Sequence, residues 1–129
     1  MTEGLGIAQA ASMICLTAHT LRYYERIGLA APPPRGPDGR RRYSESNLDW
    51  LRLITRLRST GMSIATMCRY AELVRQGPAT VAERHALLQA HRDAVHRRIV
   101  DLQRDLAVID GKIDTYAAQA HDGLALRQE

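Results

Sequence analysis

TAHTLRYYERIGL, residues 17–29, carries helix signals at both of its ends. Thr17 is a favourable N-cap residue, and Gly28 suits the position just after a helix, so a helix is predicted between them. Residues 7–13, IAQAASM, form a second, shorter helical pattern just upstream, separated from the first by three residues. A short helix, a brief turn and a second helix have the dimensions of a helix-turn-helix motif.

The segment that follows, PPPRGPDGRRR at residues 32–42, cannot be helical, because it holds four of the five prolines of the chain. Asp38-Gly39 is a strong hairpin-turn dipeptide, so we expect a β-hairpin or extended loop with a basic return strand at residues 40–43. Two further helices are predicted beyond it. Ser44 caps a helix that ends at Gly61, and Ser63 caps a helix that ends at Gly77-Pro78.

A long helix is predicted from Thr80 onward, where Thr80 and Glu83 match a capping box. Apolar residues then recur with a heptad spacing, which is typical of a coiled coil. The chain offers no second long helix to cover this seam, so a second copy of the chain is its simplest partner. The predicted dimerisation residues are Leu88, Val95, Ile99, Leu102, Leu106, Ile109, Ile113 and Tyr116.

The chain has 129 residues and a net charge of +4, with hydrophobic residues at 45%, as in ordinary globular proteins. Residues 1–60 hold a net charge of +4 and residues 79–129 a net charge of −1, which indicates a nucleic-acid-binding head on a neutral body.

No stretch is apolar enough to span a membrane. Two cysteines are too few for a disulfide scaffold, so we expect a cytoplasmic protein. No nucleophile–base pair or nucleotide-binding motif is present, so we expect no enzyme activity and no cofactor.

The polar face of the predicted second helix suits a DNA major groove, and the basic hairpin would flank it as a wing on the adjacent backbone. Hydroxyl, imidazole, guanidinium and phenol groups stand on that face, while Leu21 turns toward the core. The predicted DNA-binding residues are Thr17, His19, Thr20, Arg22, Tyr23, Arg35, Arg40, Arg41, Arg42 and Tyr43.

The stretch from Thr17 to Ile64 resembles the head of the mercury-resistance regulator (MerR) family, on the motifs TLRYYE, IGL, the Arg42-Tyr43 pair and the Leu57-Arg58 pair with Gly61. The similarity extends over about residues 5–118 and is greatest to the small members that lack a ligand-binding domain. It implies a mainly α fold: a winged helix-turn-helix DNA-binding head, and a long C-terminal dimerisation helix that forms an antiparallel coiled coil. We expect the head at residues 1–77, the dimerisation helix at 78–120 and a short disordered tail at 121–129.

The resemblance also implies a function. Such homodimers bind a pseudo-palindromic spacer in promoter DNA and distort it in response to an effector, so that RNA polymerase engages both promoter elements. Two alternatives stay open at this point: an architectural DNA-binding protein that needs no effector, and a coiled-coil adaptor. The inducer, the operator and the direction of regulation do not follow from the sequence.

Several positions depart from the family pattern. Cys15 stands where members usually have the turn glycine, so it must adopt a positive φ or remodel the turn. Residues 79–129 hold no cysteine, so no metal site or iron–sulfur cluster is expected, and Arg56 stands where thiol-sensing members carry their cysteine, so that sensing route is disfavoured as well. Cys15 and Cys68 are interpreted as packing residues. Tyr70 and Tyr116 are the candidate residues for a small-molecule effector.

Overall fold

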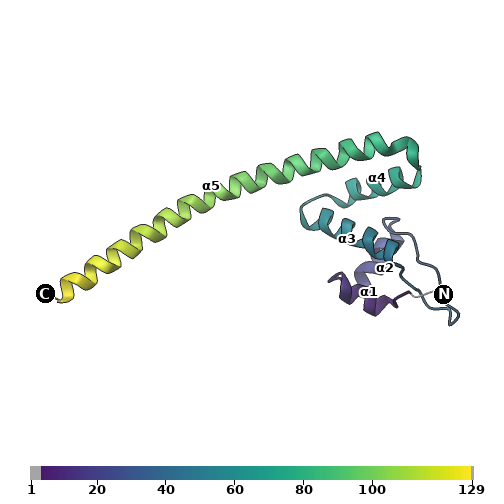
Figure 1. Cartoon of the computed structure of the whole chain (residues 1–129), viewed down its shortest axis with the longest axis horizontal. Coiled ribbons are helices and arrows are strands. Elements are labelled where there is room, and N and C mark those ends of the chain that lie inside the picture. Colours follow the sequence, from purple (N-terminus) through teal and green to yellow (C-terminus); the bar gives the residue numbers. More distant parts are fainter. Residues whose placement is uncertain (1–3, 129) are drawn as a thin grey trace. The chain divides into compact units, whose positions relative to one another are not determined.

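The computed structural model describes residues 4–128, with side chains through Leu124. The chain is helical throughout, apart from its wing (Figure 1). It divides into two units, Met1–Gln89 and Ala90–Glu129. In chain order the elements are α1 (Ile7–Met13), α2 (Ala18–Arg26), α3 (Glu45–Ser59), α4 (Ile64–Arg75), the 3-10 turn η1 (Pro78–Thr80) and α5 (Val81–Gln128).

Three helices begin at the hydroxyl residues that the sequence predicts as caps. The side chain of Thr17 accepts a hydrogen bond from the N–H of Thr20 at the start of α2. Ser44 and Ser63 do the same at the starts of α3 and α4. Each cap satisfies a backbone donor that has no partner inside its helix, and its loss typically costs about 1 kcal/mol.

The first three helices all end in the same kind of turn. The residue that follows the C-cap has a positive φ: 58° at Cys15, 79° at Gly28 and 99° at Gly61. The next N–H along the chain then bonds back to a carbonyl five residues earlier, at 2.9 Å in every case, as in a Schellman motif. Two of the residues that follow these turns, Leu29 and Met62, are buried. The turns therefore fix where the chain re-enters the core after each helix.

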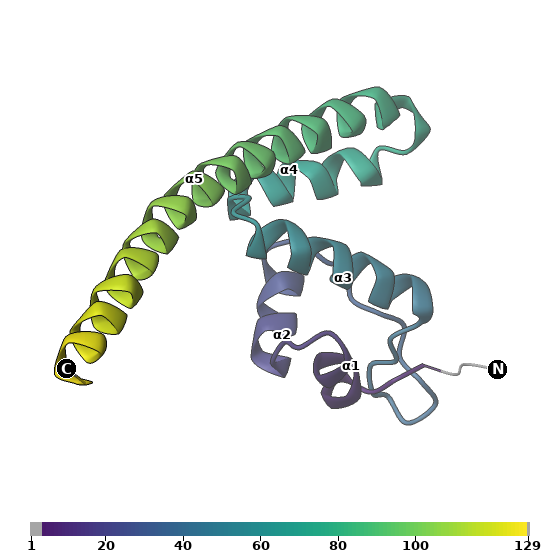
Figure 2. The ribbon, with the colours of Figure 1, turned by 60° about the vertical axis from the view of Figure 1, so that its left-hand side comes forward.

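The core of the first unit is formed by the apolar faces of α1 to α4. The first turns of α5 run alongside α4 and pack against this core (Figure 2). The largest fully buried side chains are Leu21, Leu29, Leu48, Ile54 and Met67. Trp50 is half-buried and stacks on Tyr70, with ring centroids 5.6 Å apart and planes 9° apart. Truncating a buried leucine of this kind to alanine typically costs about 2–5 kcal/mol.

The wing holds its shape with very little β structure. In the part of the chain that the structure describes, Arg35 pairs with Arg41 and Leu5 pairs with Tyr43 as isolated antiparallel bridges. The N–H of Gly36 donates to the carbonyl of Arg40 at 2.8 Å, which closes the predicted turn. Prolines at four positions of this segment have no N–H to donate, so the predicted hairpin is present without a continuous ladder.

The helix α5 begins differently from the predicted capping box. Thr80 belongs to η1, and its hydroxyl donates to the carbonyl of Leu73 and accepts from Nε of Arg84 at 3.1 Å. Arg84 Nη2 donates to the carbonyl of Gly77 at 2.8 Å. These bonds join the end of α4 to the start of α5.

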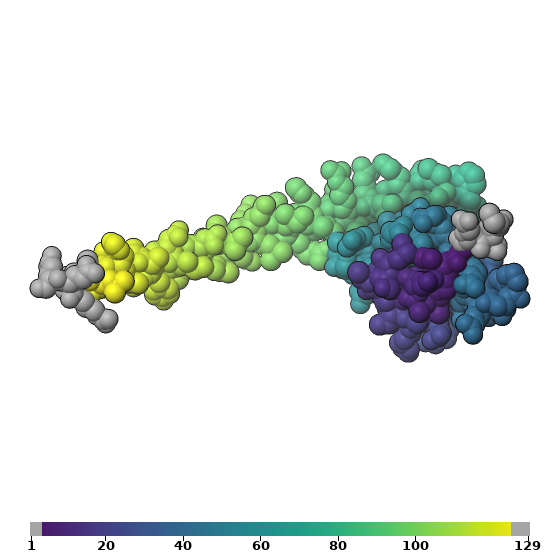
Figure 3. Space-filling view, turned by 60° about the horizontal axis from the view of Figure 1, so that its bottom comes forward, coloured from purple at the N-terminus to yellow at the C-terminus, as the bar shows by residue number. Residues whose placement is uncertain are grey.

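The structure of α5 differs from the sequence expectation at its end. The helix continues to Gln128, so residues 121–128 are helical where a disordered tail was expected. Leu88, a predicted seam residue, is half-buried and packs partly against the core of its own unit, and its place in a dimer seam stays a prediction. The other seam residues beyond Val95 expose about half or more of their side chains. Figure 3 shows the green and yellow part of the helix to which they belong.

The positive φ of Cys15 leads to the first prediction. A residue with a Cβ costs roughly 1 kcal/mol more than glycine in this conformation, so Cys15→Gly should raise the free energy of unfolding by about that amount. Urea unfolding followed by circular dichroism measures the change. Cys15→Ala is the control, because it removes the thiol and keeps the Cβ. Equal stability of Cys15→Gly and Cys15→Ala would contradict the prediction.

Candidate nucleic-acid interface

The helix α2 separates an apolar face from a polar one, as the sequence predicts. Leu21 and Tyr24 are buried, at 1% and 5% exposure, and hold the helix on the core. His19, Arg22 and Tyr23 are exposed on the opposite side. The helix therefore presents an imidazole, a guanidinium and a phenol on one accessible surface, which is the chemistry that a recognition helix uses.

The structure brings the polar face of α2 together with the wing. One open basin of about 530 Å³ is lined by Arg22 of α2, by the wing and by the chain at the start of α1, residues 6–9. The wing contributes Arg35, Arg40, Arg41 and Arg42 to the same basin. Five guanidinium groups around one concavity create a strongly positive surface that suits a phosphate backbone.

Internal bonds hold most of the wing arginines in place. Arg35 Nη1 donates to the carbonyl of Gly39 at 2.6 Å, and Arg42 Nη2 pairs with Asp38 Oδ2 at 3.0 Å. The backbone N–H of Arg40 donates to Asp38 Oδ1, and this bond, together with the charges of Arg42 and Arg40, lowers the pKa of Asp38 below its usual value. Arg40 itself is exposed, and its guanidinium has no hydrogen-bond partner among residues 4–124. It is therefore the wing arginine most accessible to a ligand.

A nearly buried carboxylate attaches the wing to α2. The side chain of Glu25 is only 9% exposed; its Oε2 pairs with Arg41 Nη2 at 3.1 Å, and its Oε1 accepts from the Tyr43 hydroxyl at 3.0 Å. Burial, then the hydrogen bond to Glu25 and its charge, raise the pKa of Tyr43 to about 12. The three residues thus hold the return strand of the wing against the recognition helix.

This arrangement affects how two of the predicted DNA-binding residues, Tyr43 and Arg41, can act. Tyr43 is 4% exposed and points its hydroxyl at Glu25, so its geometry does not support a direct contact with DNA. Arg41 lines the basin while its Nη2 is held by Glu25. Sequence reasoning missed Glu25 altogether. A carboxylate on the recognition helix, facing a run of arginines later in the chain, was the available signal.

The remaining predicted site residues lie in different places. The hydroxyls of Thr17 and Thr20 form a hydrogen bond of 2.9 Å at the start of α2, beside the exposed surface of the helix. Tyr70 is buried in the core of the first unit, whereas Tyr116 belongs to the second unit and carries Lys112 above its ring. The effector role of the two tyrosines stays a prediction. Among the described residues there is no group of three or more His, Cys, Asp or Glu that could hold a metal ion.

A helix-turn-helix whose second helix shares a basic basin with a wing defines the DNA-binding proteins of the winged helix-turn-helix class. Comparison with known proteins specifies the family. The model described as "MerR HTH family regulatory protein" matches residues 5–72, and the model described as "MerR, DNA binding" matches residues 48–121.

Individual relatives agree with the family models. An HTH-type transcriptional regulator of Haemophilus influenzae is 36% identical over 109 residues, which are 84% of this chain and 81% of that protein. The regulator AdhR of Bacillus subtilis is 41% identical over 88 residues, which are 68% of this chain and 63% of AdhR. Among solved structures, HiNmlR, a MerR family regulator that lacks the sensor domain and is bound to promoter DNA, is 34% identical with a TM-score of 0.80. That likeness covers 88% of this chain and 90% of HiNmlR.

The chain belongs to the MerR family of transcriptional regulators. The predicted family, the helical fold with a DNA-binding head and the function as a regulator rather than an enzyme are thereby confirmed. MerR regulators bind promoter DNA. No described helix of this chain combines the length and the apolar character needed to cross a membrane.

The raised pKa of Tyr43 predicts a specific loss of stability at alkaline pH. Below about pH 10 the hydroxyl is protonated in both the folded and the unfolded chain, so stability does not depend on it. Between pH 10 and the folded pKa of about 12, only the unfolded chain releases the proton. The free energy of unfolding should therefore fall across this window, by about 1–3 kcal/mol in total.

Tyr43→Phe cannot ionise and should show a shallower decline over the same pH window. Guanidinium unfolding at a series of alkaline pH values measures both slopes. Tyr116→Phe serves as the control, because it removes an exposed tyrosine and should keep the steep decline. Parallel curves for the wild-type chain and Tyr43→Phe would contradict the assignment.

Proposed function

We propose that this regulator binds promoter DNA through α2 and the wing, as a homodimer joined by α5, in the bacterial cytoplasm. The observation that carries the proposal is the basin in which Arg22 of the recognition helix meets the four wing arginines. Thr17, His19, Thr20, Arg22 and Tyr23 would face the major groove. The wing would contact the neighbouring backbone, with Tyr43 as its support.

The charges of the head favour this mode of binding. Arginine makes paired hydrogen bonds to phosphates and to guanine edges, and five arginines converge on one surface. Because Arg35, Arg41 and Arg42 are already bonded to Gly39, Glu25 and Asp38, less conformational entropy is lost when these three side chains meet DNA. The basin thus combines charge with preorganisation.

The exposed seam of α5 supports the homodimer. In the second unit, large apolar side chains at the predicted heptad positions are 47–65% exposed: Ile99, Leu102, Leu106, Ile109, Ile113 and Tyr116. The helix has 48 residues and is about 72 Å long at 1.5 Å per residue. Its apolar seam side chains are exposed to solvent in the single chain, which is typical of a surface that binds a partner. If two copies pack antiparallel about the middle of the run from Val95 to Tyr116, Leu102 faces Ile109 of the partner subunit. Residues 78–120 would then form the dimerisation region and residues 1–77 the head.

The family resemblance supplies the rest of the mechanism. The dimer would bind a pseudo-palindromic spacer, and an effector would make it bend and untwist that spacer so that RNA polymerase engages both promoter elements. A footprint on the DNA upstream of its own gene tests this reading, since one discrete protected site is expected. Protection that spreads along the DNA would favour an architectural protein instead.

Two arginines test the DNA surface directly. Arg22→Ala and Arg40→Ala should each weaken operator binding about tenfold, and the affinity should fall steeply as salt increases. Mobility shifts at several salt concentrations measure both effects. Arg104→Ala is the charge-matched control, because Arg104 is exposed on α5 outside the seam. If all three variants bind like the wild type, the assigned surface is wrong.

The seam of α5 is tested by placing a charge in it. Leu106→Lys should convert the dimer to a monomer, because two lysines would face an apolar interface. Val108→Lys is the control: Val108 is 75% exposed and lies outside the seam, so the dimer should persist. Sedimentation velocity at micromolar concentration distinguishes the species. A wild-type chain that sediments as a monomer of 14.4 kDa would overturn the dimer proposal.

A further inference from the structure

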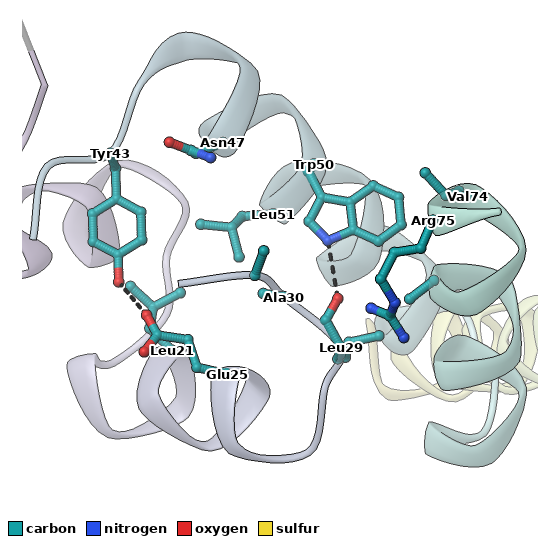
Figure 4. Close-up of a pocket in the computed structure, with 12 residues that line it drawn as sticks. Leu21, Glu25, Leu29, Ala30, Tyr43, Asn47, Trp50, Leu51, Val74 and Arg75 are labelled. Carbon is teal, nitrogen blue, oxygen red and sulfur yellow. Dashed lines mark hydrogen bonds between the residues drawn. The ribbon is translucent and has the colours of Figure 1, made fainter. Parts of the chain in front are cut away.

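A second concavity of the first unit lies on the inner side of the recognition helix, away from the arginine basin. It has a volume of about 210 Å³, is open to solvent on one side, and is lined by α2, by the turn after α2, by the base of the wing, by α3 and by α4 (Figure 4). Leu21, Leu29, Leu51 and Val74 are among its apolar lining residues. It is therefore an apolar cavity at the place where all the DNA-binding elements meet.

The charged groups at its edge are already paired within the protein. Glu25 is held by Tyr43 and Arg41, and Figure 4 shows the Tyr43 hydroxyl directed at its carboxylate. Arg75 donates to Glu72 and, at 2.8 Å, to the carbonyl of Gly28. The indole N–H of Trp50 donates to the carbonyl of Leu29 at 3.1 Å. An ionic ligand would find no unpaired countercharge here, so the lining favours a neutral one.

Asn47, a polar residue of the lining, has a side-chain N–H donor that is not used within the part of the protein that the structure describes. Asn47 Oδ1 accepts from both the N–H and the hydroxyl of Ser44, each at 2.8 Å, and this fixes the orientation of the amide. Its Nδ2 has no hydrogen-bond partner among the described residues. Because Asn47 lines the cavity, its amide nitrogen is available to donate a hydrogen bond to an acceptor on a ligand bound there.

The volume sets the size of the ligand. A cavity of about 150 Å³ accepts benzene in a well-studied engineered protein. A space of 210 Å³ accommodates a single ring with a short substituent. Size, neutrality and the single donor together describe a monocyclic molecule that carries one carbonyl group.

We infer that this cavity is an effector site for a neutral monocyclic carbonyl compound, held by its apolar walls and by the amide of Asn47. Binding would act on α2 and the wing together, because Leu21, Glu25 and Tyr43 belong to the same lining. The binding site itself stands independently, whereas its regulatory role rests on the proposed function.

Acetophenone is the test probe, and α-methylstyrene has nearly the same shape without the acceptor oxygen. The chain has a single tryptophan, Trp50, which lines the cavity, so its indole N–H resonance reports occupancy. We expect a saturable shift with both compounds and none with benzoate, which carries a charge. Absence of a saturable shift up to the solubility limit of acetophenone, or equal binding of benzoate, would overturn the assignment.

Two variants separate the roles of the walls and of the amide. Asn47→Asp keeps the oxygen that Ser44 needs and removes the N–H donor, so acetophenone should bind about fivefold or more weakly while α-methylstyrene changes by less than about twofold. Ala31→Phe should fill the cavity from its exposed rim and abolish binding of both compounds. Ala65→Phe, at an exposed position of α4 outside the lining, is the matched control and should bind both. If Ala31→Phe still binds them, the ligand lies elsewhere.

A DNA measurement then separates the site from the function. Saturating acetophenone should change the dissociation constant for the upstream duplex by roughly threefold or more in the wild type, and leave it unchanged in Ala31→Phe. Occupancy without any change in DNA affinity would overturn the effector role. A chain that binds acetophenone but not DNA would refute the proposed function and leave the binding site standing.

Discussion

The arrangement of the DNA-binding head depends on the need to neutralise one carboxylate. Glu25 is 9% exposed, and a charge this far out of water is strongly destabilising unless it is paired and hydrogen-bonded. Both of its partners, Arg41 and Tyr43, come from the return strand of the wing. The contacts to Glu25 therefore hold the return strand of the wing on the recognition helix, together with the backbone pairing of Tyr43 with Leu5.

Other features of the head follow from this pairing. Because Arg41 is held at Glu25, the adjacent Arg40 and Arg42 are brought to the basin that Arg22 lines. Because Tyr43 is held there too, its backbone is placed to pair with Leu5, which ties the segment before α1 to the base of the wing. Tyr43 and Glu25 also line the apolar cavity. One ion pair and one hydrogen bond thus position the DNA surface on one side and the cavity on the other.

Local signals explain which parts of this fold could be predicted from the sequence. The caps at Thr17, Ser44 and Ser63 act within one turn of helix, so their effect is readable from neighbouring residues. At Cys15 the family resemblance left two outcomes open, a positive φ or a remodelled turn, and the structure has the positive φ. Thr80 matched a local capping pattern and still adopts another role, since its hydroxyl is used by α4. Tertiary contacts decided that position.

The functional residues were harder to predict where they depend on packing between distant segments. Tyr43 directly follows three arginines and was predicted to contact DNA with them. Its hydroxyl instead donates to Glu25, eighteen residues earlier, and its side chain lies in the interior. Leu88 fits the heptad and also packs partly against the core of its own unit, which periodicity alone does not show. The cavity has no sequence signature, because it is a volume left between elements whose apolar residues read simply as core. Periodicity identifies which side chains are buried and does not show where their packing is incomplete.

The contacts around α4 determine how a change inside the head would reach the rest of the chain. Arg75, the last residue of α4, joins that helix to the turn after the recognition helix through the carbonyl of Gly28, and Thr80 and Arg84 join the same end of α4 to the start of α5. A displacement of α2 must therefore either break the bond to Gly28 or carry α4 with it, and α4 cannot move without its connection to α5. Energetic coupling requires an element with two distinct arrangements that both sites can favour. In this head, α4 is the element that contacts the cavity, the recognition helix and the start of α5, so it is where such a second arrangement should be sought.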